Sequence, residues 1–223
     1  MEKKKNGFLV KDFFIDGQIQ MAGIFKDKKM KKHIGEFIWY FENGNVNQKG
    51  RFVNNEKEGE WNWYFENGNI DRKGSYVKNE RQGEWKWYFE NGQASSIEEY
   101  IEGERVKAQF FNQEGKEISQ EEGEYNPGSP SRKDSLSYLL ETLGTYPEEA
   151  RIANIKGPVV VRILVGKTGE IERKKLLQKQ HPILNEEALR VVSLLPPSLL
   201  KAKEHGRRIK YWLNIPVKFK LKR

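Results

Sequence analysis

The side chains that could do acid–base or metal chemistry do not have the spacing that such chemistry requires. The three histidines are far apart in sequence, and none belongs to a metal-ligand motif (His33, His181 and His205). Glu42, Glu66 and Glu90 recur every 24 residues, which predicts a row along a repeat structure and not a pair across a cleft. The chain has no cysteine and so no thiol nucleophile. We therefore expect no enzyme activity, no catalytic residue, no metal and no cofactor.

One short stretch imitates a phosphate-binding loop. Gly166-Lys167-Thr168 has the end of that motif, but the motif needs a glycine five residues before Gly166, where Val161 stands. Val161 lies in a run of mostly β-branched residues that predicts a strand over 159–165, and a second strand is predicted over 171–177. We therefore interpret residues 166–169 as the tight turn of a hairpin.

Aromatic rings offer the remaining chemistry, because their faces can stack on sugars or peptides. Five of the six tryptophans lie between residues 35 and 106 (Trp39, Trp61, Trp63, Trp85 and Trp87). Rings that face one another across strands also stabilise thin sheets, so we favour a core role for them. An aromatic surface that binds a ligand such as a glycan is the alternative.

These tryptophans belong to three tandem copies of a 24-residue unit, which begin at Gly35, Gly59 and Gly83 without gaps. A degenerate copy precedes them around Phe13 to Gly23, and another follows around Phe110 to Gly115. A fixed period of this size indicates a repeat architecture in which each unit buries its apolar face against its neighbours.

Each unit has the pattern of a β-hairpin. In the second unit, Trp61, Trp63 and Phe65 alternate with polar residues or tyrosine along one strand, and residues 70–76 alternate along another. Asn67-Gly68 between them predicts a two-residue type I′ turn with positive φ at both positions. Polar residues 78–83 form the turn to the next unit. The sequence predicts an antiparallel meander.

The units resemble MORN-type repeats, in the variant found in YwqK-like toxin–antitoxin proteins. The resemblance rests on Gly-Glu-Trp, Trp-Tyr-Phe-x-Asn-Gly and Lys-Gly-x-Tyr, as at 59–61, 63–68 and 73–76, and it extends over about residues 8–118. It implies a repeat scaffold and leaves the function open.

The chain length suggests about two domains. We predict MORN-like hairpin repeats over 1–118, a linker with a short helix over 119–145, and a C-terminal domain over 146–223. In the linker region, Leu136, Leu139, Leu140 and Leu143 have helical spacing, with Asp134 as the N-cap and Gly144 just past the end. The predicted fold class is α+β.

The C-terminal domain reads as strand, strand, helix, strand. Leu184, Ala188, Val191 and Leu195 mark a helix face, Pro196-Pro197 ends the helix, and a last strand alternates over 209–221. The helix returns the chain along the sheet, so the last strand should pair with the first, in the spatial order 2-1-3. Pro216 fits an edge strand because it has no N–H to donate.

This domain resembles the C-terminal domain of TonB energy transducers, a ββαβ fold. The resemblance rests on Tyr146-Pro147, Ile155-x-Gly157, Leu195-Pro196 and Ile215-Pro216-Val217-x-Phe219, and it covers about 146–221. It implies a periplasmic domain that binds the N-terminal segment of outer-membrane receptors by adding a strand to its sheet edge. Carried over to this sequence, the peptide-binding edge strand contains Arg208, Lys210, Tyr211, Asn214 and Val217.

Charge and hydropathy bear on partners and location. Residues 146–223 contain 18 Lys and Arg against 7 Asp and Glu, which favours an acidic partner for this domain. Lysines at 3–5 and 26–32 form a second basic cluster that suits anionic lipid. Met1–Asn6 looks like the start of a signal peptide, but Lys11 and Asp12 interrupt the apolar stretch that should follow. We expect the periplasm or cell envelope if a signal or anchor was removed, and the cytoplasm otherwise.

We therefore expect a non-catalytic binding or scaffold protein of the bacterial cell envelope, accessory to TonB-dependent transport across the outer membrane. Its partner would be a protein or peptide, and no recognisable nucleic-acid reading module is present. The alternative is a cytosolic MORN or antitoxin-like repeat protein that binds a protein partner or an anionic lipid surface.

Overall fold

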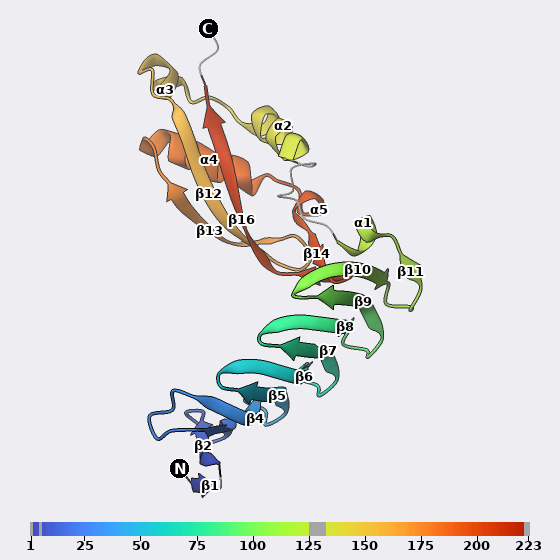
Figure 1. Ribbon diagram of the computed structural model, residues 1–223. Helices are drawn as coiled ribbons and strands as arrows, with labels where there is room; N and C mark the ends of the chain where they lie inside the picture. Colours follow the sequence, from blue (N-terminus) through green and yellow to red (C-terminus); the bar gives the residue numbers. More distant parts are fainter. Residues whose placement is uncertain (1, 5, 125–132, 221–223) are drawn as a thin grey trace. The chain divides into compact units, whose positions relative to one another are not determined.

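The computed structural model describes residues 2–4, 6–124 and 133–220 (Figure 1). The chain divides into two compact units, Met1–Gly123 and Glu124–Arg223. The first is a long antiparallel meander, and the second combines a small sheet with helices. This is the predicted α+β class. Among the described residues, no helix is long and apolar enough to cross a membrane.

The first of these two compact units, called the repeat array below, is one antiparallel sheet in which eleven described strands follow in chain order (Figure 1). The strands are β1 (Glu2–Lys4), β2 (Gly7–Phe13), β3 (Ile19–Phe25), β4 (His33–Tyr40), β5 (Val46–Val53), β6 (Glu56–Tyr64), β7 (Ile70–Val77), β8 (Glu80–Tyr88), β9 (Ala94–Ile101), β10 (Glu104–Phe111) and β11 (Glu117–Ile118). The meander predicted from the 24-residue period is confirmed.

The turn within each 24-residue repeat differs from the predicted type. The Gly68 N–H donates to the Phe65 carbonyl (2.9 Å), and the Phe65 N–H donates to the Asn69 carbonyl (2.8 Å). Only Gly68 of this turn has a positive φ, +88°. It is therefore a three-residue loop with a type I turn and a left-handed glycine, and the predicted two-residue type I′ turn was wrong.

Two-residue turns with positive φ at both positions instead join one 24-residue repeat to the next. They are Asn54-Asn55, Lys78-Asn79 and Glu102-Gly103. Strands β6 and β8 therefore begin at Glu56 and Glu80, three residues before the predicted unit starts.

Asparagine side chains connect the three-residue turns of neighbouring units. The Nδ2 atoms of Asn43 and Asn45 donate to the Glu66 carbonyl oxygen, at 3.0 and 2.7 Å. One unit later, Asn67 and Asn69 donate to the Glu90 carbonyl oxygen in the same way, at 3.4 and 2.7 Å. These bonds hold successive turns in line along one side of the sheet.

Glycines at equivalent strand positions make room for the tryptophan rings. A Cβ atom at Gly74 would lie 2.2 Å from the Trp85 ring, and one at Gly50 would lie 2.1 Å from the Trp61 ring. The ring of each unit thus lies directly on the backbone of the preceding unit. This contact explains the glycine of the Lys-Gly-x-Tyr pattern.

A short helix closes the array where the sequence predicted only linker. Helix α1 (Gln120–Gly123) follows a reciprocal cap, in which the Ser119 N–H donates to Glu122 Oε2 (3.1 Å) and the Glu122 N–H to Ser119 Oγ (3.3 Å). Gly123 lies against the ring of Phe110, which is buried. A repeat array needs a cover for its last apolar face, and α1 supplies it. The predicted linker residues 125–132 lie outside the described part of the chain.

The second unit holds a three-stranded antiparallel sheet in the order β13-β12-β16, the predicted order 2-1-3. Its core lies between this sheet and α4, with Val161, Ile163, Leu184 and Ile215 fully buried. The elements are α2 (Lys133–Leu143), α3 (Glu148–Ile152), β12 (Gly157–Val165), β13 (Ile171–Gln178), α4 (Pro182–Ser193), α5 (Pro197–Leu200), β14 (Ala202–Glu204), β15 (Arg207–Ile209) and β16 (Tyr211–Phe219).

Helix α2 packs on this same core through Leu136, Leu139, Leu140 and Leu143. Gly144 follows its end as predicted, and its N–H donates to the Leu140 carbonyl (2.9 Å). The helix begins at Lys133, and the side chain of the predicted N-cap Asp134 lies outside the described residues.

We expect Gly74→Ala to lower the free energy of unfolding of the repeat array by about 2 kcal/mol, because the new methyl group overlaps the Trp85 ring. Urea unfolding followed by tryptophan fluorescence measures this change. Lys73→Ala, one residue away, is the control and should cost less than about 0.5 kcal/mol.

The ring contact itself is tested by combining Gly74→Ala with Trp85→Leu. The two costs should then sum to less than expected, because the smaller side chain relieves the overlap. Additive costs would show that the glycine is needed for another reason.

Candidate functional site

The last strand of the second unit is a regular edge. All nine residues of β16 pair with β12 in one continuous register, from Tyr211 opposite Val165 to Phe219 opposite Gly157. Leu213, Ile215, Val217 and Phe219 are buried, and the residues between them are exposed. Among the described strands, none pairs with the other side of β16. The outer edge of β16 is therefore not paired with any described strand, and helix α2 packs against part of β16.

Three of the five residues predicted for the peptide-binding edge lie on β16. Tyr211 is half-buried, and its hydroxyl donates to the Leu200 carbonyl (2.7 Å). Asn214 is exposed, whereas Val217 is buried in the core.

The other two residues lie before the strand. Arg208 belongs to β15, which pairs with β14 in a separate hairpin, and Arg208 stands opposite Lys203. Lys210 follows β15 and forms an ion pair with Glu172 of β13. The strand predicted from residue 209 thus begins at Tyr211, because the turn at His205-Gly206, with positive φ at both residues, makes a hairpin of residues 202–209.

Trp212 is a candidate that the sequence prediction missed. Its side chain is 44% exposed, and the Arg162 guanidinium carbon lies 5.0 Å from its ring centre. It projects from the face of β16 that points away from the core. The alternation of Trp212 with buried Leu213 was the available signal, since a tryptophan at an outward position is unusual for a structural role.

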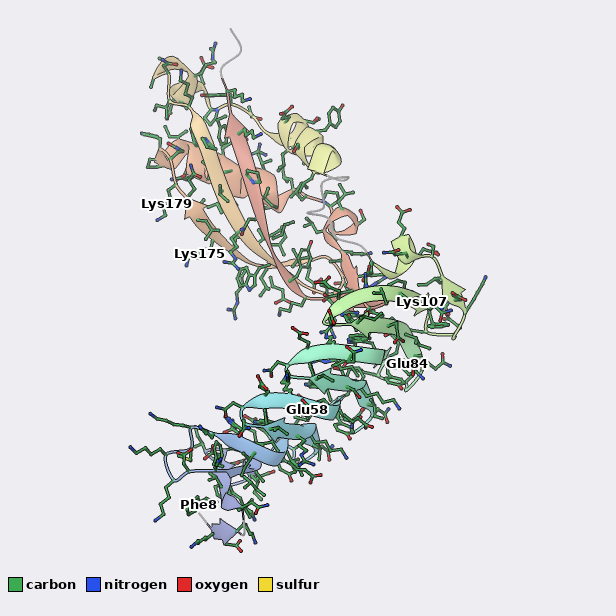
Figure 2. The ribbon with its side chains drawn as sticks, viewed as in Figure 1. Phe8, Glu58, Glu84, Lys107, Lys175 and Lys179 are labelled. Atoms are coloured by element: carbon green, nitrogen blue, oxygen red, sulfur yellow. The ribbon has the colours of Figure 1, made fainter. Side chains whose placement is uncertain are left out.

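The opposite edge of the sheet is less suited to strand addition. The register of β13 against β12 shifts twice, between Val160 and Val161 and between Leu164 and Val165. Charged residues 172–175 are exposed along β13, and Lys175 and Lys179 point away from the sheet (Figure 2). Bulges and lysines are features that protect an edge from pairing.

The tryptophans of the repeat array form a continuous stack. Trp61, Trp85 and Trp87 are at most 1% exposed and Trp63 is 7% exposed, whereas Trp39 is only partly buried. Ring centroids of successive tryptophans from Trp61 to Trp87 lie 5.6–5.8 Å apart. These four rings are core residues of the sheet, and their faces are not accessible to a ligand.

Cationic side chains cover the stack at equivalent positions of successive units. Lys57 Nζ lies 4.6 Å from the Trp61 ring centre and 5.0 Å from that of Tyr76. The Arg81 guanidinium carbon lies 4.9 Å from the Trp85 ring centre. Burial, followed by the nearby arginines, lowers the pKa of Lys57. The cations therefore serve the aromatic core and not an open binding face.

A buried carboxylate ends the stack. Glu98 occupies the position of Gly50 and Gly74 in the third unit, and it accepts hydrogen bonds from Ser96 Oγ (3.0 Å) and from the Tyr100 hydroxyl (2.8 Å). Burial and this bond raise the pKa of Tyr100 to about 12. The carboxylate takes the space that a tryptophan ring fills in the other units.

Comparison with known families agrees with this division. The family model of the Gram-negative bacterial TonB protein C-terminal matches residues 144–221. The model of the MORN repeat variant matches residues 34–54, 57–78 and 81–102. The chain joins MORN-type repeats to a TonB C-terminal-like domain. Both are binding or scaffold families, which indicates an envelope-associated or protein-binding role.

Solved structures similar to the chain include two NMR structures of the Helicobacter pylori TonB C-terminal domain. One is 24% identical over 40% of this chain and 94% of its own, with a TM-score of 0.33, and the other is 26% identical over 44% and 90%, with a TM-score of 0.34. The Gap123 glycosylation-associated protein complex of Streptococcus agalactiae is 11% identical over 51% and 20%, with a TM-score of 0.29. No curated protein matches the sequence. At these TM-scores the likenesses support no conclusion on function.

We expect the free energy of unfolding of the repeat array to depend on keeping the Tyr100 hydroxyl protonated. Its folded pKa of about 12 lies above the ordinary value of about 10, so its contribution is complete below pH 10 and is lost as the pH rises through 12. Urea unfolding at several pH values between these limits measures the loss. Tyr100→Phe should remove that part of the pH dependence, and parallel curves for both proteins would contradict the assignment.

Proposed function

We propose that the chain is a non-catalytic binding protein of the bacterial cell envelope whose TonB-like domain binds an extended peptide by adding it as a strand to β16. The observation that carries the proposal is the nine-residue edge in unbroken register, with no strand on its outer side among the described residues. The family match at residues 144–221 supports it. Main-chain hydrogen bonds would supply the affinity.

Pro216 identifies which residues would bond the peptide. In an antiparallel pair, residues that bond across to the partner alternate with residues whose N–H and C=O point away. Pro216 stands opposite Val160 in an unbroken register and has no N–H to donate, so it belongs to the set that points away from β12. Trp212, Asn214 and Lys218 share its parity, and their N–H groups would donate to the peptide.

Charge would select the peptide. Residues 146–223 contain 18 Lys and Arg against 7 Asp and Glu, and Lys218 is exposed on the strand itself. A peptide with acidic side chains is therefore attracted to this edge over a distance of about 10 Å at moderate salt. Trp212 would pack on an apolar or aromatic residue of the same peptide.

The MORN-type array would act as the scaffold or docking part of the protein. Its aromatic residues are committed to its own core, and its exposed faces carry charged residues such as Glu84 and Lys107 (Figure 2). On this proposal the protein works in the periplasm, accessory to TonB-dependent transport, and its partner is an outer-membrane receptor segment.

Asn214→Pro tests the strand addition. The substitution removes an outward N–H at a position of the same parity as Pro216, so it should spare the β12 pairing and leave the melting temperature nearly unchanged. Affinity for labelled synthetic peptides that carry the N-terminal box of outer-membrane receptors should fall about tenfold or more, as one lost main-chain bond and a local clash imply. Fluorescence anisotropy measures the binding.

Asn214→Ala is the matched control, because it removes the side chain and keeps the N–H. It should bind the peptides like the wild type. If Asn214→Pro binds equally well, or if both variants lose binding together, the peptide is not held by the main chain of β16.

A further inference from the structure

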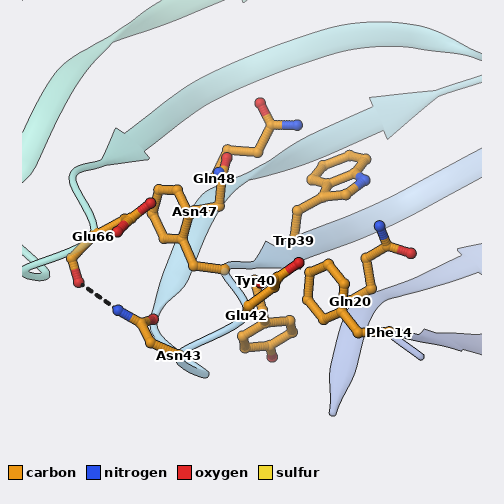
Figure 3. Close-up of a pocket in the computed structure, with 10 residues that line it drawn as sticks. Phe14, Gln20, Trp39, Tyr40, Glu42, Asn43, Asn47, Gln48 and Glu66 are labelled. Atoms are coloured by element: carbon orange, nitrogen blue, oxygen red, sulfur yellow. Dashed lines mark hydrogen bonds between the residues drawn. The ribbon is translucent and has the colours of Figure 1, made fainter. Parts of the chain in front are cut away.

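The repeat array contains a cavity of about 660 Å³ beside its three-residue turns (Figure 3). The cavity lies between the degenerate copy of the repeat and the copy that begins at Gly35. Phe14 and Gln20 line it from the degenerate copy, and Trp39, Asn47 and Gln48 from the first full copy. Its volume is within the range of sites that bind small molecules, about 300–1,000 Å³.

The cavity is open because two residues of the repeat differ. Gln48 stands opposite Trp39 across β4 and β5, and the equivalent residue of the next copy, Arg72, stands opposite Trp63. The Arg72 guanidinium carbon lies 4.5 Å from the Trp63 ring centre, and Arg72 pairs with Asp71 at 3.2 Å. Neutral Asn47 and Gln48 replace this ion pair in the first copy and leave Trp39 partly exposed.

Several polar groups that line the cavity have no hydrogen-bond partner within the described chain, although Asn43 donates to the Glu66 carbonyl (3.0 Å). The indole nitrogen of Trp39 makes no hydrogen bond to any described residue, and the side-chain amides of Gln20, Asn47 and Gln48 make none either. Trp39 packs against the rings of Phe37, Phe52 and Trp61, with centroids 5.6, 6.3 and 6.0 Å away. Its exposed part lies in the cavity with these unbonded neutral amides.

The charge of the cavity restricts its ligand. Glu42 and Glu66 lie at its rim and are exposed, and its lining includes no Lys, Arg or His among the described residues. Anionic ligands are therefore disfavoured. The inner wall is aromatic and amide in character, which matches a ligand with one apolar face and many hydroxyl groups.

We propose that this cavity binds a neutral oligosaccharide. A sugar ring stacks on Trp39, and its hydroxyl groups exchange hydrogen bonds with the Trp39 indole N–H and with the amides of Gln20, Asn47 and Gln48. The rim carboxylates of Glu42 and Glu66 accept from further hydroxyls. This site lies on the repeat array and is independent of the peptide-binding edge on β16.

The sharpest test grafts the closed form of the next copy onto the site. Asn47→Asp with Gln48→Arg should fold like the wild type, because the same pair already occupies the equivalent positions at Asp71 and Arg72. Isothermal titration calorimetry with three neutral trisaccharides, of N-acetylglucosamine, of β-linked glucose and of α-linked glucose, should show binding of at least one by the wild type. The graft should weaken that binding about tenfold or more. Trp212→Ala, which changes an exposed tryptophan in the other unit, should bind the sugar normally.

A second readout identifies the ring. The NMR signal of the Trp39 indole N–H, recognised by its absence in Trp39→Phe, should shift on sugar addition, and the signals of the buried tryptophans should not. The proposal is overturned if none of the three sugars binds at millimolar concentration, if the graft binds as well as the wild type, or if tetramethylammonium shifts the Trp39 signal and the sugars do not.

Discussion

The repeat array depends on the contact between a tryptophan ring and the bare backbone of a glycine in the preceding unit. Trp61 lies on Gly50 and Trp85 lies on Gly74, at distances that a Cβ atom would not allow. Each large ring is therefore buried by a neighbour and not by its own hairpin, which alone is too small to hide it. Stability in such an array is a property of adjacent pairs of units.

Much of this architecture follows from the sequence, because the 24-residue period and the alternation of rings along each strand leave few other folds. The turn type does not follow from Asn67-Gly68, since that pair suits more than one hairpin loop. The Asn67 side chain accepts a hydrogen bond from the Asn69 N–H (2.9 Å) and donates to the neighbouring turn at Glu90. The loop is thus determined partly by a residue 23 positions away.

The ends of elements were harder to predict than their existence. Helix α1 has only four residues, and its place is fixed by contact of Gly123 with Phe110, which no local pattern reveals. In the second unit, Pro216 correctly indicated an edge strand. The family resemblance placed Arg208 on that edge, whereas the turn at His205-Gly206 pairs it with β14. The open side of Trp39 could be recognised only after Gln48 and Arg72 were seen to occupy equivalent places.

The asparagine bonds between turns have a consequence for how such an array can vary in length. Asn43 and Asn45 meet Glu66 as Asn67 and Asn69 meet Glu90, so the two junctions are interchangeable. Removing or duplicating the second 24-residue copy would keep the same turn and ring contacts, whereas an insertion of any other size would misalign both the turns and the rings. Evolution can therefore change the reach of this protein only in whole-unit steps.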